Sequence, residues 1–173
     1  MAFAFFVLYT TFSLVRHARI QTAGYDLGIF DQAIRSYAHF RAPVSAIKGP
    51  GFNLLGDHFH PVLALLAPLY WLWDDPRTLL TAQAALIAAS VIPVARLAIR
   101  RLGPAQGTAV ATAYGFSWGI QGAIAFDFHE IAFAVPLMAF AMTALAEQRI
   151  YYLCWRPRRS RHCARPSPWS PHP

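Results

Sequence analysis

The 173-residue chain has little charge. Asp, Glu, Lys and Arg make up 13% of it, about half of the ~25% usual in soluble domains, whereas 56% of its residues are hydrophobic. It has eight acids and only two cysteines, and both cysteines lie in residues 154–173, where they indicate neither a redox compartment nor a metal site. Thirteen Phe, seven Tyr and five Trp are typical of segments that face a bilayer or its interface. The composition therefore predicts an integral membrane protein.

Residues 154–173 differ from the body of the chain, residues 1–153, which we interpret as a transmembrane domain. They hold five of the fifteen basic residues and five of the thirteen prolines, without a helical or strand period, and predict a disordered tail. One interpretation is a basic juxtamembrane tail that attracts anionic lipid. The interpretation that the composition favours is an out-of-frame read-through after a truncated gene. Nucleic-acid binding is not expected, because these basic residues lack a structured scaffold.

Four apolar stretches are expected to cross the membrane, and together they predict an all-α bundle. They are Met1–Val15, Thr78–Ala95, Gly107–Ile124 and Ile131–Ala146. The first is shorter than the ~20 residues that a span needs, and we interpret its start as clipped. Small residues in the other three suit close contact between helices in lipid, where internal prolines are also tolerated. Residues 16–60 are mixed in character and predict a long loop.

The stretch Val62–Trp73 decides the topology. As a helix, its twelve residues reach only about 18 Å, short of a ~30 Å hydrocarbon core, so we interpret it as interfacial or re-entrant. If it does not cross, the loop 16–60 and residues 126–130 are separated by two crossings and share one side of the membrane. The basic cluster around Arg100 and Arg101 predicts a cytoplasmic connection, which leaves both of these loops outside.

Five of the eight acids and three of the histidines gather in three short motifs. They are "YDLGIFDQ" with Asp26, Asp31 and Gln32, "GDHFHP" with Asp57, His58 and His60, and "DFHE" with Asp127, His129 and Glu130. Charged side chains beside a membrane are costly, so such clustering marks a candidate functional site. In the topology above, the three motifs meet at one membrane face.

Each motif also has a purely structural interpretation. Asp26 would cap a helix that continues through Leu27 and Phe30, and on that helix Asp31 lies roughly 140° away from it. The "GDHFHP" motif has the residue types of a metal site but no third strong ligand nearby, so a solvated loop is an equal alternative. The "DFHE" motif would cap the following helix with negative charge. The coincidence of three motifs favours a functional site.

Two chemistries suit such a cluster. A carboxylate at the membrane surface would take the proton of an acceptor hydroxyl, or stabilise the positive charge that develops on a sugar. Alternatively, a divalent cation held by Asp57, His58 and His129 would neutralise a phosphate leaving group. Both fit a membrane lipid whose phosphate lies at the interface. A transporter also gathers charges, but near the bilayer midplane rather than at helix ends.

Several stretches resemble a known family. The segments "YDLGIFDQAIRSYAH", "LLGDHFHPVLALLAPLYWLWDDPRTLLTAQA", "RLAIRRLG" and "FDFHE" are similar to the domain-of-unknown-function 2079 family of bacterial multi-pass membrane proteins, from about Tyr25 to Glu147. That family is biochemically uncharacterised and is similar in layout to the C-type (GT-C) glycosyltransferases. The resemblance implies transfer of a sugar from a polyprenyl-phosphate donor at the external face of the bacterial inner membrane.

The resemblance also implies roles for single residues. Asp26 matches the catalytic acid of the first external loop, with Asp31 as its substitute. His60 matches a His-Pro element, and Asp127 and Glu130 match acids of the second external loop; we group these three with Gln32 as substrate-binding residues. The first motif reads Asp-Leu-Gly rather than Asp-Glu, which leaves open which acid is the base.

This chain has fewer helices than GT-C enzymes, and we expect it to be an inactive fragment of such an enzyme. The competing hypothesis is a non-enzymatic membrane protein, a transporter or assembly component, whose acids and histidines bind ions. The sequence names neither the sugar nor the acceptor.

Overall fold

The computed structural model describes residues 1–22, 24–57 and 59–147, and its fold over these ranges is all-α, as predicted. Its α-helices are α1 (Ala2–Ala18), α2 (Tyr25–Ala38), α3 (Ala67–Leu72), α4 (Arg77–Leu102), α5 (Pro104–Gly115), α6 (Trp118–Ala125) and α7 (Ala134–Ala146). Four short 3₁₀ helices join them: η1 (Ala46–Lys48), η2 (Leu54–Gly56), η3 (Pro61–Leu66) and η4 (Glu130–Phe133). The predicted tail, 154–173, lies outside the described residues.

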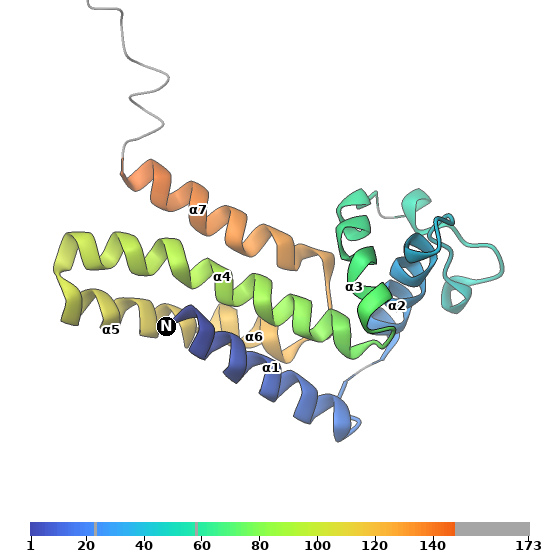
Figure 1. Cartoon of the computed structure of the whole chain (residues 1–173), viewed down its shortest axis with the longest axis horizontal. Coiled ribbons are helices and arrows are strands. Elements are labelled where there is room, and N and C mark those ends of the chain that lie inside the picture. The colour runs from blue at the N-terminus through green and yellow to red at the C-terminus, as the bar shows by residue number, and fades with distance from the viewer. Residues whose placement is uncertain (23, 58, 148–173) are drawn as a thin grey trace, which may run out of the picture.

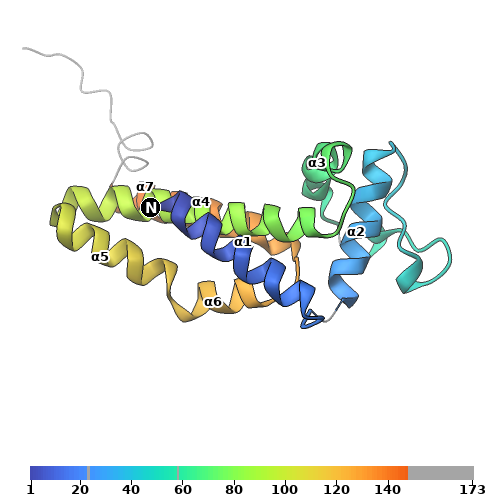
Figure 2. The same ribbon diagram turned by 60° about the horizontal axis from the view of Figure 1, so that its bottom comes forward.

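Helix α4 is the axis of the bundle. It packs against α1, α5 and α7, and α2 and α3 sit at the end where it begins (Figures 1 and 2). Its 26 residues include the whole expected span Thr78–Ala95, and Pro93 does not interrupt it. Within the described ranges it is the one helix long and apolar enough to cross a membrane, while α1 and α7 with η4 are shorter apolar helices.

The expected span Gly107–Ile124 is not one helix. A break at Ser117, whose backbone is extended (φ −63°, ψ 150°), divides it into α5 and α6. The carbonyl of Gly115 accepts a hydrogen bond from the hydroxyl of Tyr9, at 2.7 Å, instead of one from the next helical turn. The ring of Phe5 packs so closely that a Cβ at Gly115 would lie 2.3 Å from it. The approach of α1 is therefore the physical reason for the break.

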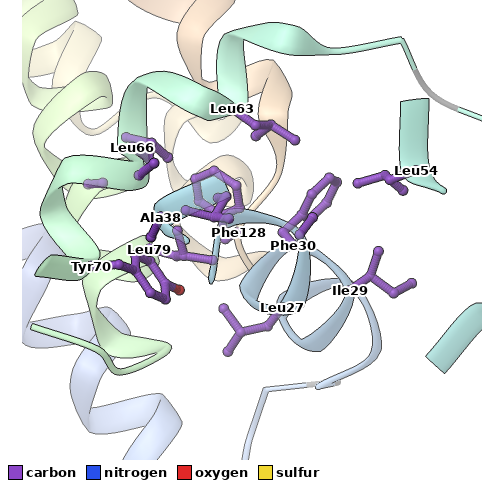
Figure 3. Close-up of a cluster of buried hydrophobic side chains, with 14 of the residues drawn as sticks. Leu27, Ile29, Phe30, Ala38, Leu54, Leu63, Leu66, Tyr70, Leu79 and Phe128 are labelled. Atoms are coloured by element: carbon purple, nitrogen blue, oxygen red, sulfur yellow. The ribbon is translucent and has the colours of Figure 1, made fainter. Parts of the chain in front are cut away.

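The prediction that residues 16–60 form a long loop is wrong, because α2 lies within it. Apolar residues recur in this helix with the i, i+3, i+7 spacing of a buried helical face, at Leu27, Phe30 and Ile34. These side chains share a core with Phe128 of the third motif and Leu79 of α4 (Figure 3 labels Leu27, Phe30, Phe128 and Leu79). Burial of each large side chain stabilises the fold by roughly 1.5–3 kcal/mol.

The stretch 61–72 forms η3 and α3 and packs mainly against α2 rather than along α4 (Figure 2). The indole of Trp71 donates to the carbonyl of Ala38, at 2.8 Å, and holds α3 on α2. Tyr70 is buried, whereas Leu72 is 86% exposed. The unit is therefore amphipathic, with one side buried against α2 and the other exposed.

The two ends of α4 differ in character. The segments that carry the three motifs lie where α4 begins, and the basic cluster lies where it ends (Figure 1). There Arg100 forms an ion pair with Glu147, and Arg101 donates to the carbonyl of Ala146, at 3.1 Å. The three motifs and the basic cluster thus lie at opposite ends of α4.

Candidate functional site

The third motif is anchored by a glutamine that sequence reasoning missed. Gln83 of α4 is only 4% exposed. Its Nε2 donates to the carbonyls of Ala123, Phe126 and Asp127, at 3.1, 3.4 and 3.4 Å, and its Oε1 accepts from the backbone N–H of His129, at 2.9 Å. The signal in the sequence was a lone amide in a run of Ala, Leu and Ile. Gln83 fixes the irregular backbone between α6 and η4.

Asp127 joins the third motif to the first. Its side chain is 5% exposed, and Oδ2 accepts from the backbone N–H of Gly24, at 2.9 Å. Gly24 is the N-cap residue of α2 and has a left-handed backbone (φ 76°), which glycine adopts without strain. The carboxylate thus stands at the positive end of the α2 dipole. Asp26, expected as the cap, lies in the first turn of α2 instead.

Glu130 lies between two histidines. Its Oε1 is 3.7 Å from Nδ1 of His60, and its Oε2 is 3.8 Å from Nε2 of His129. The Glu130 side chain is 10% exposed, while the imidazoles are 38% and 39% exposed. Both distances exceed those of hydrogen bonds. Among the described residues, Oε2 of Glu130 and Nδ1 of His129 are buried without a hydrogen-bond partner. The second and third motifs therefore meet at a buried carboxylate.

Aromatic rings hold the His129 imidazole in place. The ring centroids of Phe30 and Phe126 lie 5.5 and 5.6 Å from that of His129, both edge to face. Phe30 also contacts the fully buried Phe128, at 5.6 Å. Because Phe30 belongs to α2, the first motif contributes directly to the surroundings of His129.

Asp31 lies in a separate network. Its Oδ1 accepts from the hydroxyl of Tyr70, at 2.7 Å, and the carboxylate pairs with Arg35, at 3.3 Å. Arg35 also pairs with Asp74, at 2.6 Å. Burial, and then the hydrogen bond to Asp31, raise the pKa of Tyr70 above its ordinary value. Asp31 thus joins α2 to α3 and is not brought to the histidines.

Asp26 differs from Asp31 in its surroundings. It makes no hydrogen bond or ion pair with any residue that the structure describes, and it lies one turn before Phe30 on the same face of α2. Its charge acts on Lys48, which forms an ion pair with Asp57. The Asp57 hydrogen bond raises the pKa of Lys48, and the negative charge of Asp26 adds to this effect. The structure thus gathers Asp26, Lys48 and Asp57 on one side of α2.

Gln32 supports a loop. Its Oε1 accepts from the hydroxyl of Ser45, at 3.1 Å, and from the backbone N–H of Ala46, at 2.8 Å. These bonds tie the connection after α2 back onto the helix. The Gln32 amide oxygen is therefore already engaged in holding the backbone that carries Lys48.

The structure describes two of the three residues expected to bind a divalent cation, Asp57 and His129. Asp57 pairs with Lys48, and His58 lies outside the described residues. Within the described ranges no group of three His, Cys, Asp or Glu side chains is placed to hold an ion. Glu130 presents a different oxygen to each of its two histidines, so the three side chains do not converge on one point.

Comparison with known proteins identifies one family. The model of the family described as "Predicted membrane protein (DUF2079)" matches residues 16–155. The match covers most of the chain, so the chain belongs to this family and is a membrane protein. No curated protein and no solved structure matches it.

Proposed function

Because the chain belongs to this family of membrane proteins, we propose that it carries the motif-bearing helices of a GT-C-like glycosyltransferase. The protein spans the bacterial inner membrane several times and takes its sugar from a polyprenyl-phosphate carrier at the external face. The gathering of the three motifs at one end of α4, opposite the Arg100 and Arg101 cluster, supports this orientation.

One observation carries the assignment of roles: the two acids of the first motif have different surroundings. A general base must be free to accept a proton from a bound hydroxyl. Asp31 is bound to Tyr70 and Arg35, whereas Asp26 makes no hydrogen bond or ion pair with the described residues. We therefore assign Asp26 as the base and Asp31 as a positioning residue that holds α2 on α3.

The proposed reaction needs one proton transfer. Asp26 takes the proton of the acceptor hydroxyl while that oxygen forms a bond to the anomeric carbon of the sugar. The bond from the anomeric carbon to the phosphate oxygen breaks, and polyprenyl phosphate leaves with the electron pair. Imidazole N–H groups of His60 and His129 bind the phosphate oxygens, and Glu130 between them orients both rings. Asp127 and Gln32 do not contact the substrate in this scheme. They hold the backbone at Gly24 and Ala46 through hydrogen bonds.

The test of the reaction uses a full-length family member in membranes and a synthetic polyprenyl-phosphate-linked sugar. The variant equivalent to Asp26→Asn should lower transfer by roughly 10²–10⁴-fold, because a general base contributes about that factor. The matched variant Asp31→Asn should lower thermal stability and leave transfer by the folded fraction largely intact. Full transfer by the Asp26→Asn enzyme would sink the assignment. Cation or proton uptake that depends on Asp26, without transfer, would favour the transporter hypothesis.

The test of the orientation uses single cysteines in a chain whose two native cysteines are replaced by serine. Phe126→Cys and Gly56→Cys lie at exposed positions at the motif end, and Leu102→Cys lies at an exposed position at the other end. In intact cells, an impermeant maleimide should label the first two and spare the third. Labelling of positions 56 and 126 from opposite sides would refute a shared site.

A further inference from the structure

An apolar groove follows α7 away from the polar cluster. It consists of two adjoining cavities, of about 250 Å³ and about 410 Å³, which share Ile131 and Val135. The first lies beside the third motif, and Asp127 and His129 belong to its lining. The second continues between α4, α5 and α7 as far as Thr143. The groove is thus polar at one end and apolar along its length.

Small side chains make this groove, and exposed apolar side chains border it. Gly122, Ala123 and Ala132 line the first cavity, and a Cβ added at Gly122 would meet no atom within 4 Å. Ile131 and Met138 are 65% and 62% exposed at its edge. A concave apolar surface with a few polar groups at one end is the usual form of a site for an amphiphilic ligand.

The direction of the groove matches that of a lipid chain. Along α4 its lining extends from Gln83 to Val94, eleven residues or about 16 Å of helix. This length is about half of a ~30 Å hydrocarbon core. Because α4 is the helix long enough to cross a membrane, the groove runs from the motif end of the bundle toward the bilayer midplane.

We propose that this groove holds the hydrocarbon chain of a single-chain phosphate lipid, with the phosphate at His129. The inference rests on the proposed function, since such a lipid is the carrier of the donor sugar. His129 lines the polar end of the groove and its imidazole is 39% exposed, so the ring is placed to donate a hydrogen bond to a phosphate oxygen. Arg16 adds positive charge at this end, where its guanidinium donates to the carbonyl of Ala125. One groove takes one chain, whereas a two-chain phospholipid would leave its second chain outside.

The test is photo-crosslinking of the full chain in phosphatidylcholine nanodiscs. The probe is hexadecyl phosphate with a diazirine in its chain, and hexadecanol with the same diazirine is the neutral comparison. Labelled peptides are identified by mass spectrometry. We expect the label within residues 122–143, and stronger labelling by the phosphate than by the alcohol. Labelling spread evenly over the apolar helices would overturn the groove, and equal labelling by the alcohol would overturn the phosphate at His129.

Gly122 supplies the decisive variant. Gly122→Leu fills the first cavity from a position with open space, and should lower labelling about tenfold, the factor that corresponds to 1.4 kcal/mol. Gly119→Leu is the matched control, because Gly119 belongs to the same helix and has equal space but does not line the groove. If Gly122→Leu is misfolded, Gly122→Ala serves in its place and should lower labelling by a smaller factor. Undiminished labelling of a folded Gly122 variant contradicts the proposal.

The labelling does not depend on sugar transfer, so the two proposals can fail separately. Groove labelling of this chain, together with no sugar transfer by the full-length family member, would overturn the glycosyltransferase alone. Transfer by a family member whose residue equivalent to Gly122 has been enlarged, with undiminished rate and affinity for the donor, would overturn the groove alone. Crosslinks between two copies of the chain through α7 would show that a second copy covers the groove, and would also overturn it.

Discussion

Replacement of Gln83 by leucine tests whether one buried amide holds the third motif in place. Gln83→Leu keeps a side chain of similar size in α4 and removes every polar contact to residues 123–129. The backbone N–H of His129 then loses its acceptor, and the carbonyl of Ala123 loses its donor. We expect the segment between α6 and η4 to loosen while the helices around it remain folded.

The magnitude follows from the two well-formed hydrogen bonds, at 2.9 and 3.1 Å, because the contacts at 3.4 Å are weak. An unsatisfied buried group costs about 1–3 kcal/mol, and burial of the leucine offsets part of the loss. A net loss of about 2 kcal/mol corresponds to a fall in the melting temperature of roughly 4–8 °C for a chain of this size. Gln83→Glu should cost more, since a carboxylate would face the carbonyls.

The assay is thermal unfolding of the full chain in detergent, followed by circular dichroism, together with hydrogen exchange of the His129 amide. Gln106→Leu is the control, because Gln106 is an exposed helical glutamine with no hydrogen bond to the described residues. The reasoning is refuted if Gln83→Leu melts within about 1 °C of the wild type and its His129 amide stays protected.

Three further predictions concern the connections around the site. Tyr70→Phe removes the 2.7 Å hydrogen bond to Asp31 and should cost about 1–2 kcal/mol in thermal unfolding at pH 7. Because the folded pKa of Tyr70 is raised, wild-type stability should decline as the pH rises above 10, and Tyr70→Phe should abolish this part of the decline. Ile20→Gly should raise stability by about 1 kcal/mol, since Ile20 is 90% exposed and has a left-handed backbone (φ 56°) that penalises a β-branched residue. The Arg77 hydrogen bonds lower the pKa of Asp75 below 3.8, so Asp75→Asn should destabilise the fold at pH 7. The effect should vanish once the pH has fallen through the lowered pKa, which is checked by unfolding measured across that pH range.

The gathering of the motifs was predictable because it depends only on how many times the chain runs along the bundle between them. Two passes, out along α4 and back, return the chain to the same end of the bundle. This proximity allows the hydrogen bond between Gly24 and Asp127, at 2.9 Å and 103 positions apart in sequence. The class of fold follows similarly from the long apolar runs.

The difference in surroundings between Asp26 and Asp31 was not predictable, because it depends on distant partners. Nothing near Asp31 in the sequence indicates that Tyr70 will donate to it from 39 positions away. The break at Ser117 has the same origin, since Tyr9 and Phe5 create it from another helix. Helix α2 is a different case. Its apolar period was present in the sequence, and the polar residues between the apolar ones obscured it.

The surroundings of the acids explain how a chain so poor in charge keeps several carboxylates beside a bilayer. A carboxylate there is costly unless a hydrogen-bond donor or a cation stabilises its charge, and otherwise it marks a functional site. Asp127 accepts a hydrogen bond at the N-terminus of α2, and Asp31 accepts one from Tyr70 and pairs with Arg35. Glu130 lies beside one imidazole on each of its two oxygens. Asp26 differs from these three, because it makes no hydrogen bond or ion pair with the described residues and acts on Lys48 only through its charge. Its place on α2, one turn from Phe30, whose ring packs on His129, is the geometry on which the proposed role of Asp26 rests.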